Sequence, residues 1–156
     1  MTSFAKARAL ALLIPAALLA GAWSFQLFGH LYPCEMCHWQ RWPHYAALVI
    51  ALLSFVPHTP KRMLVALAAV AIAVSGMIGV AHAGVEYHWW PGFTPCTATF
   101  GTSGDILADI MKAPVVRCDS PQWTLFGISL AGFNAIVSLA GACVIGWFLV
   151  RRTRAA

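Results

Sequence analysis

The stretch "MLVALAAVAIAVSGMIGVAHAGV", residues 63–85, determines the class of fold, because it contains no Asp, Glu, Lys or Arg. An apolar α-helix needs about 20 residues to cross the hydrocarbon core of a bilayer. This stretch is long enough, and Lys61 and Arg62 stand directly before it. We therefore predict a transmembrane helix over residues 63–85.

Three further stretches lack charged residues, at 9–29, 42–57 and 120–150. The chain is 60% hydrophobic and only 10% charged, and a soluble domain of this size could not cover so much apolar surface. The run at 42–57 is short, so its helix is expected to begin earlier, near Cys37. The sequence thus predicts an all-α membrane protein, a four-transmembrane-helix bundle forming one integral membrane domain (1–156), with spans at about 9–29, 38–57, 63–85 and 121–150.

The charged residues predict the orientation of the bundle, because short cytoplasmic segments collect Lys and Arg. Seven of the ten cations lie on one side of the spans: Lys6, Arg8, Lys61, Arg62, Arg151, Arg152 and Arg154. All five acidic residues lie on the other side: Glu35, Glu86, Asp105, Asp109 and Asp119. Both termini are expected in the cytoplasm, with outer loops at about 30–37 and 86–120. The net charge of +5 reflects this topology, so no nucleic-acid partner is expected.

The first apolar stretch also fits a secretory signal peptide, since Ala20-Gly21-Ala22 resembles a cleavage site of small residues. The apolar run does not stop there but continues through Phe28. We therefore expect this segment to be retained as a transmembrane helix.

The second outer loop, 86–120, is long enough to carry an extramembrane function. Trp89 and Trp90 near its start suit the membrane interface. The segment "TSGDILADIMK", 102–112, has an apolar and a charged face at helical spacing and predicts a short interfacial helix, with a solvated loop as the alternative. Ser120 and Pro121 suit the N-cap and first position of the fourth span, which is expected to begin there.

Four of the five cysteines fall on the outer face: Cys34, Cys37, Cys96 and Cys118. Disulfides persist on such a face, because it is oxidising. Cys96 and Cys118 could form a structural disulfide that closes the long loop, or the loosely built loop could carry them to another site. Cys143 lies deep in the fourth span, where we expect it to act as inert packing.

The pattern C-x-x-C at Cys34 and Cys37 is typical of a redox-active thiol pair. At the start of a helix both sulfurs lie near its positive end, which lowers the pKa of a thiol. Arg41 follows Cys37 by four residues, so its guanidinium lies over the same helix face and can hold Cys37 as a thiolate. A reactive dithiol level with the bilayer surface needs an electron acceptor, and the most available one at that depth is a lipid-soluble quinone.

Two alternatives use the same residues. Cys34, Cys37 and His38 spell C-x-x-C-H, the attachment pattern of a c-type haem, with His30 or His88 as the second axial ligand. Such a haem protein would lack a pocket, because the motif runs straight into a span, and it would leave Arg41 unexplained. The four cysteines could also bind zinc, but thiols on an oxidising face pair with each other, so no metal is expected.

Taken together, these features resemble the disulfide bond formation protein B (DsbB) family of bacterial inner membranes. The resemblance rests on four spans, C-x-x-C at the start of the second, Arg41, and the second cysteine pair in the longer outer loop. The segment "WTLFGISLAGFN", 123–134, is also similar to the family's fourth helix. The resemblance implies a multi-pass protein of the inner membrane whose active face is periplasmic.

The resemblance also implies an electron relay. A reduced periplasmic thiol oxidase of the DsbA type would attack Cys96, and Cys118 would resolve the mixed disulfide. Electrons would then pass to Cys34 and Cys37 by way of a bond between Cys34 and Cys96. Cys37, beside Arg41, would reduce ubiquinone or menaquinone from the membrane quinone pool.

The family also places a histidine near the quinone. Its match in this chain is expected to be His88 in "GVEYHWW". His82 and Glu86, one helical turn apart, are rival contacts for the quinone.

Overall fold

The computed structural model describes residues 2–92, 94 and 116–151, and that part of the chain is mostly helical. Its elements are the helices α1 (Ser3–Leu27), α2 (Glu35–Leu53), α3 (Lys61–Glu86) and α5 (Leu130–Val150), with the short strands β1 (Thr124–Leu125) and β2 (Ile128–Ser129). The expected interfacial helix at 102–112 and Cys96 lie outside the described residues.

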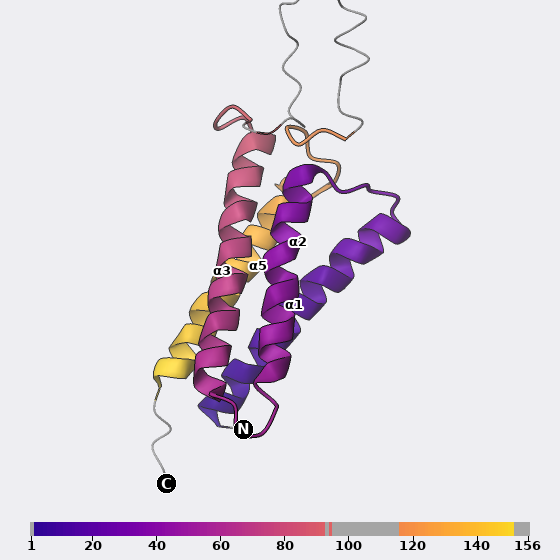
Figure 1. Ribbon diagram of the computed structural model, residues 1–156. Helices are drawn as coiled ribbons and strands as arrows, with labels where there is room; N and C mark the ends of the chain where they lie inside the picture. Colours follow the sequence, from indigo (N-terminus) through magenta and orange to yellow (C-terminus); the bar gives the residue numbers. More distant parts are fainter. Residues whose placement is uncertain (1, 93, 95–115, 152–156) are drawn as a thin grey trace, which may run out of the picture.

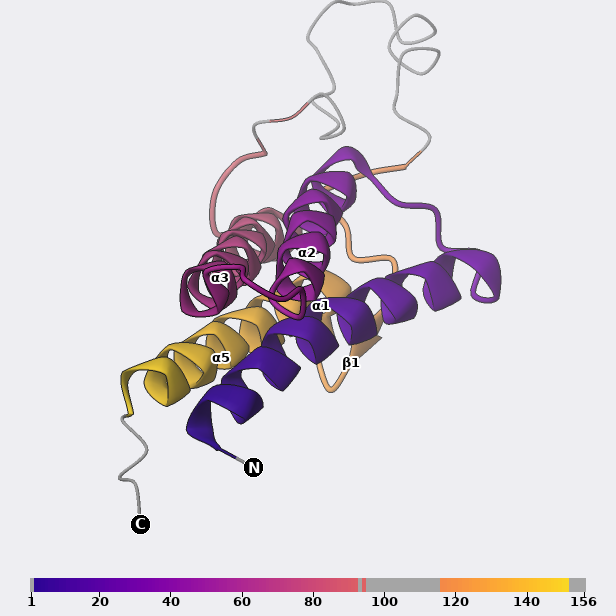
Figure 2. The same ribbon diagram turned by 60° about the horizontal axis from the view of Figure 1, so that its bottom comes forward.

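The four described helices form one bundle in which α3 packs against α2 and α5, and α1 packs against α2 and α5. Figure 1 shows α2 and α3 side by side and α5 running obliquely behind α3, while α1 diverges from α2 towards its C-terminal end. Both views place the start of α1, the turn between α2 and α3, and the end of α5 at the same end of the bundle (Figure 2). The start of α2 and the end of α3 therefore lie together at the opposite end.

The first two helices begin earlier than the sequence predicted. The side chain of Thr2 caps α1 by accepting a hydrogen bond from the Ala5 amide at 3.2 Å. Cys34 is the N-cap of α2, and its sulfur accepts a hydrogen bond from the Cys37 amide at 3.3 Å. Because a thiol occupies the cap position, the cysteine pair is built into the first turn of the helix.

The predicted start of the fourth helix at Pro121, with Ser120 as N-cap, is wrong. Phe126 and Gly127 have φ angles of 52° and 76°, and they connect the antiparallel strands β1 and β2, in which Leu125 pairs with Ile128. A two-residue turn with both φ angles positive suits a tight β-hairpin. Helix α5 begins only after this hairpin, and the Ser129 hydroxyl caps it by accepting from the Gly132 amide at 3.1 Å. The hairpin and α5 both lie within the uncharged stretch at 120–150, so the absence of charge could not show where the helix begins.

Small residues let the helices approach closely at the end of the bundle remote from Cys34. The buried cluster there comprises Ala7, Ala11, Ala47, Ala51, Val65, Ala68, Ala69, Ile72 and Ile145. Higher in the bundle, a Cβ placed on Gly79 would lie 3.0 Å from the Ala131 carbonyl oxygen and the Ala135 amide nitrogen. Glycine is therefore required where α3 crosses α5.

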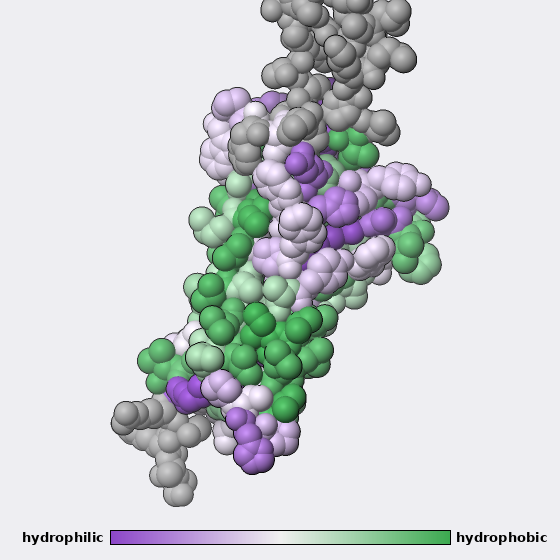
Figure 3. Space-filling view, viewed as in Figure 1, coloured by the Kyte–Doolittle hydropathy of each residue, from purple (hydrophilic) through white to green (hydrophobic). Residues whose placement is uncertain are grey.

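Three of the described helices, α1, α3 and α5, are long and apolar enough to cross a membrane. Helix α2 has 19 residues, but Gln40, Arg41 and His44 make it more polar. These three side chains are buried in the bundle, so their polarity is turned inwards. Figure 3 shows apolar residues gathered across the middle of the bundle and hydrophilic residues towards its ends. The chain is therefore built as a multi-pass membrane protein.

Candidate dithiol site

The cysteine pair lies at the start of α2, where the sulfur atoms of Cys34 and Cys37 are 2.8 Å apart. Both thiols are free, and Cys34 is only 3% exposed. The N-cap position points the Cys34 sulfur back over the first turn, which brings it to Cys37. A hydrogen bond joins the two sulfurs.

This hydrogen bond makes the two thiols unequal. The hydrogen bond to Cys37 and burial together raise the pKa of Cys34, which favours its protonated form. The hydrogen bond from Cys34 stabilises the Cys37 thiolate and lowers the pKa of Cys37, with a smaller contribution from the positive charge of Arg41. Cys37 is therefore the thiol of the pair that loses its proton more readily.

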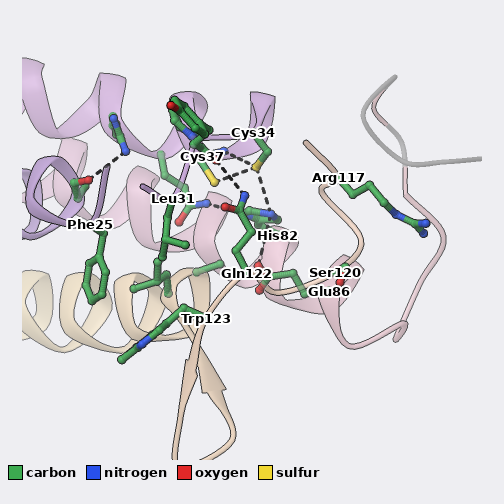
Figure 4. A pocket seen from close by; sticks show the side chains of 17 residues that line it. Phe25, Leu31, Cys34, Cys37, His82, Glu86, Arg117, Ser120, Gln122 and Trp123 are labelled. Atoms are coloured by element: carbon green, nitrogen blue, oxygen red, sulfur yellow. Dashed lines mark hydrogen bonds and ion pairs between the residues drawn. The ribbon is translucent and has the colours of Figure 1, made fainter. Parts of the chain in front are cut away.

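Helix α3 brings His82 and Glu86 to the dithiol (Figure 4). His82 Nε2 lies 3.6 Å from the Cys34 sulfur and 3.7 Å from a carboxylate oxygen of Glu86. Both side chains are buried. His88, in contrast, is exposed in the turn after α3, with a φ of 57°, and does not line the cavity at the dithiol. Of the three expected quinone contacts, the structure thus gathers two.

Cys118 belongs to the same buried cluster as the dithiol. This cluster comprises Cys34, Met36, Val85 and Cys118, with Cys37, Trp39, Ala81 and Val116 packed against it. Cys118 is fully buried and disulfide-bonded, and His82 hydrogen-bonds to its backbone. One cysteine of the second predicted pair therefore lies beside the first pair, although Cys118 follows Cys34 by 84 positions in the sequence.

Arg41 is held by α1. Its guanidinium donates to the Gln26 side-chain oxygen at 2.7 Å and to the Ala22 carbonyl at 3.3 Å, and it lies 5.6 Å from the ring centre of Trp23. No carboxylate pairs with Arg41 among the described residues, although it is only 9% exposed. A buried cation without a carboxylate is suited to an anionic partner such as a thiolate or a reduced ligand.

Two cavities meet at Arg41. The first has a volume of about 100 Å³ and is lined by Cys34, Cys37, Arg41, His82 and Glu86, among others. The second has about 300 Å³ and lies between α1, α2 and α5, with mostly apolar walls that include Leu18, Phe25 and Phe133. Gln40 and Arg41 line both cavities, so they form the wall between the dithiol and an apolar chamber.

Sequence reasoning missed a chain of buried polar side chains behind this wall. Gln40 Nε2 contacts His82 Nδ1 at 2.7 Å, Asn134 Nδ2 donates to Gln40 Oε1 at 2.9 Å, and Asn134 Oδ1 lies 2.9 Å from His44 Nε2. Each of these residues interrupts an apolar stretch or begins one. These polar residues could have indicated the network from the sequence, because burying a polar group inside a spanning helix costs free energy unless it hydrogen-bonds to another such group.

The alternatives of metal and haem receive little support from this geometry. The ligand atoms of Cys34, Cys37 and His82 all lie within 4.8 Å of one another, which makes a three-residue metal cluster conceivable. Two thiolates bound to one zinc at 2.3 Å in tetrahedral geometry would stand about 3.8 Å apart, whereas these sulfurs are 2.8 Å apart. His38 is exposed on α2, and Cys34 is buried against His82 rather than open to a macrocycle.

A multi-helix membrane protein with a free dithiol next to a disulfide-bonded cysteine belongs to the class of thiol-disulfide oxidoreductases. The chain belongs to the DsbB family: the family model described as disulfide bond formation protein DsbB matches residues 5–148. No curated protein and no solved structure matches the chain. The family match spans all four described helices almost completely and makes this a membrane protein of disulfide bond formation.

Proposed function

We propose that this protein reoxidises a periplasmic thiol oxidase of the DsbA type and passes the electrons through two cysteine pairs to a membrane quinone. The observation that carries the proposal is the meeting of a free dithiol, Cys34 and Cys37, with the disulfide-bonded Cys118 in one buried cluster. Arg41 adjoins that cluster and an apolar chamber, which suits transfer to a lipid-soluble acceptor.

The proposal includes a topology of four spans in one domain, 1–156, of the bacterial inner membrane. Helix α2 is about 28 Å long at 1.5 Å per residue, close to the thickness of the hydrocarbon core. Its polar side chains face the bundle interior, so it can cross beside α1, α3 and α5. Both termini are then cytoplasmic, because the cations gather there, and the dithiol faces the periplasm.

The proposed relay begins in the second outer loop. A thiolate of the reduced oxidase attacks Cys96 of the Cys96–Cys118 disulfide, and the Cys118 thiolate leaves. The second thiol of the partner then attacks the mixed disulfide, which releases the partner with a disulfide of its own and leaves Cys96 and Cys118 reduced, so that Cys96 is free to act on the inner pair. Cys96 attacks Cys34 of an oxidised Cys34–Cys37 pair, and Cys37 leaves as a thiolate, the state that its hydrogen bond from Cys34 favours in the reduced pair.

The residues present fit a quinone. Its ring and apolar tail suit the chamber between α1 and α5, and Arg41 provides hydrogen-bond donors and positive charge at the chamber wall. A bound quinone supplies an acceptor for two electrons and two protons. Arg41 holds the acceptor and stabilises Cys37, while His82 and Glu86 line the dithiol side of the wall. His88, which the resemblance favoured, is exposed and has no part in this proposal.

The test is a turnover assay with purified protein in detergent, a reduced DsbA-type oxidase and ubiquinone or menaquinone. We expect quinone reduction and a mixed disulfide with the partner that depends on Cys96. Cys37→Ala should abolish quinone reduction, whereas Cys143→Ala, which removes the exposed thiol of α5, should retain it. Full turnover by Cys37→Ala would refute the proposal, and a covalently bound haem on a denaturing gel would favour the c-type haem alternative.

A further inference from the structure

His44 is a buried histidine of α2 that the relay above does not use. It is 3% exposed, and its Nε2 lies 2.9 Å from Asn134 Oδ1 and 3.4 Å from the Ser138 hydroxyl. Its other ring nitrogen, Nδ1, has no hydrogen-bond partner in the described part of the chain. His44 also lines the apolar chamber of about 300 Å³, together with Arg41 and Asn134.

The surrounding hydrogen bonds determine which nitrogen of His44 carries the proton. Asn134 Nδ2 donates to the Ser75 carbonyl oxygen at 3.2 Å, and a carbonyl can only accept, so this end of the amide is the nitrogen. Asn134 Oδ1 is therefore an acceptor, and the His44 Nε2 beside it must donate. In the neutral ring, Nδ1 is then a hydrogen-bond acceptor.

The orientation of the neighbouring amide agrees with this assignment. Gln40 Nε2 donates to the Met36 carbonyl oxygen at 3.2 Å, which leaves Gln40 Oε1 to accept from Asn134 at 2.9 Å. Both amides are thus anchored by backbone carbonyls. The network fixes the ring of His44, but it is a poor proton conductor, because the side-chain amides of Gln40 and Asn134 carry no readily ionisable proton.

Two residues of the chamber wall therefore differ in hydrogen-bonding character. Arg41 has only donors, whereas neutral His44, whose ring lines the chamber, has an acceptor at Nδ1 that is itself buried, so a ligand reaches it only when neighbouring side chains shift. A buried acceptor without a partner costs about 1–3 kcal/mol, so a ligand hydroxyl that bonds to it gains affinity. An oxidised quinone has carbonyl acceptors and no ring donor, but its reduced form, the quinol, has two hydroxyl groups.

We propose that His44 Nδ1 accepts a hydrogen bond from a ring hydroxyl of the quinol, so that the chamber binds the reduced form more tightly than the oxidised form. The inference rests on the proposed function and adds a residue that sets the driving force of its last step. Selective binding of the product makes the bound quinone a stronger oxidant of the dithiol. A tenfold preference corresponds to about 30 mV for a two-electron couple.

The experiment measures binding without turnover. Dissociation constants of a short-chain ubiquinone and of its quinol are determined separately, under anaerobic conditions, on the full chain carrying Cys37→Ser to prevent electron transfer. The His44→Phe variant keeps a ring in the site but removes the acceptor. We expect its affinity for the quinol to fall roughly 3- to 10-fold, the loss of one hydrogen bond, and its affinity for the quinone to change less than about twofold on the same grounds.

Ser138→Ala is the matched control. Ser138 donates to Asn134 Oδ1 at 3.0 Å but does not line the chamber, so the variant weakens the network without removing the acceptor. Both affinities should stay near those of the parent. Equal losses for quinone and quinol in His44→Phe, or no loss for either, would overturn the inference.

A measurement on the parent protein keeps the inference testable if His44→Phe does not fold. The parent must bind quinol more tightly than quinone, and equal affinities would overturn the role of His44. The proposed function can fail on its own. If the protein prefers quinol in the binding experiment but reduces no quinone in the turnover assay, the role of His44 stands and the proposed electron relay is refuted.

Discussion

Arg41 of α2 and Gln26 of α1 are joined by a hydrogen bond of 2.7 Å, which ties the helix bearing the dithiol to the helix that forms the opposite wall of the apolar chamber. The Ala22 carbonyl accepts a second bond from the same guanidinium. Because both bonds come from one face of α1, Arg41 is fixed in direction rather than free to reach the membrane surface.

Removal of the Arg41 charge should therefore weaken the binding of quinone. A hydrogen bond to a charged group contributes about 1.5–3 kcal/mol, so we expect Arg41→Gln to raise the KM for quinone roughly 10- to 100-fold. Steady-state kinetics with varied quinone measure this change. Arg62→Gln is the control, because Arg62 is exposed at the other end of the bundle, where it bonds to the Leu149 carbonyl. Equal effects of the two substitutions would argue against a role of Arg41 at the chamber.

The unequal cysteine pair predicts the pH dependence of alkylation. The Cys37 thiolate is stabilised by the hydrogen bond from Cys34, so the pKa of Cys37 is lowered. In the reduced protein, the rate of Cys37 modification by iodoacetamide should have its midpoint below the usual pH of about 8.5 for a cysteine. Cys34→Ala removes the donor, so the midpoint should move to higher pH. A midpoint that does not move would show that the bond between the sulfurs has no part in activating Cys37.

The contact between α3 and α5 predicts an effect on stability. A side chain at Gly79 would meet the backbone of Ala131 and Ala135 at 3.0 Å, so Gly79→Leu must push the two helices apart. Overpacking of this kind costs about 1–3 kcal/mol. Thermal unfolding in detergent should show a lower midpoint for Gly79→Leu, while Gly146→Leu on α5, where no atom lies within 4 Å of a Cβ, should not. Equal midpoints for the two variants would contradict the close packing.

The helical class of the fold followed from uncharged stretches, since length and apolarity set what can cross a bilayer. Their ends did not follow, because the run at 120–150 holds both a hairpin and a helix, and only the φ angles of Phe126 and Gly127 separate them. The closeness of Cys34 and Cys37 could be predicted from the sequence, because the two residues are three positions apart. The approach of His82, Asn134 and Cys118 was not, since it depends on how α3, α5 and the segment before the hairpin pack around α2.

The order of the two outer cysteines predicts which substitution traps the partner. Cys118 is fully buried beside the dithiol, so an incoming oxidase cannot reach its sulfur without displacing the cluster around Met36 and Val85. The partner should therefore exchange with Cys96. In Cys118→Ala, Cys96 is left as a free thiol, so with the oxidised oxidase this variant should accumulate a mixed disulfide between Cys96 and the oxidase, seen on a non-reducing gel. Cys143→Ala should accumulate none. A trapped complex in Cys96→Ala and not in Cys118→Ala would reverse the proposed order, because it would make Cys118 the residue that the partner attacks.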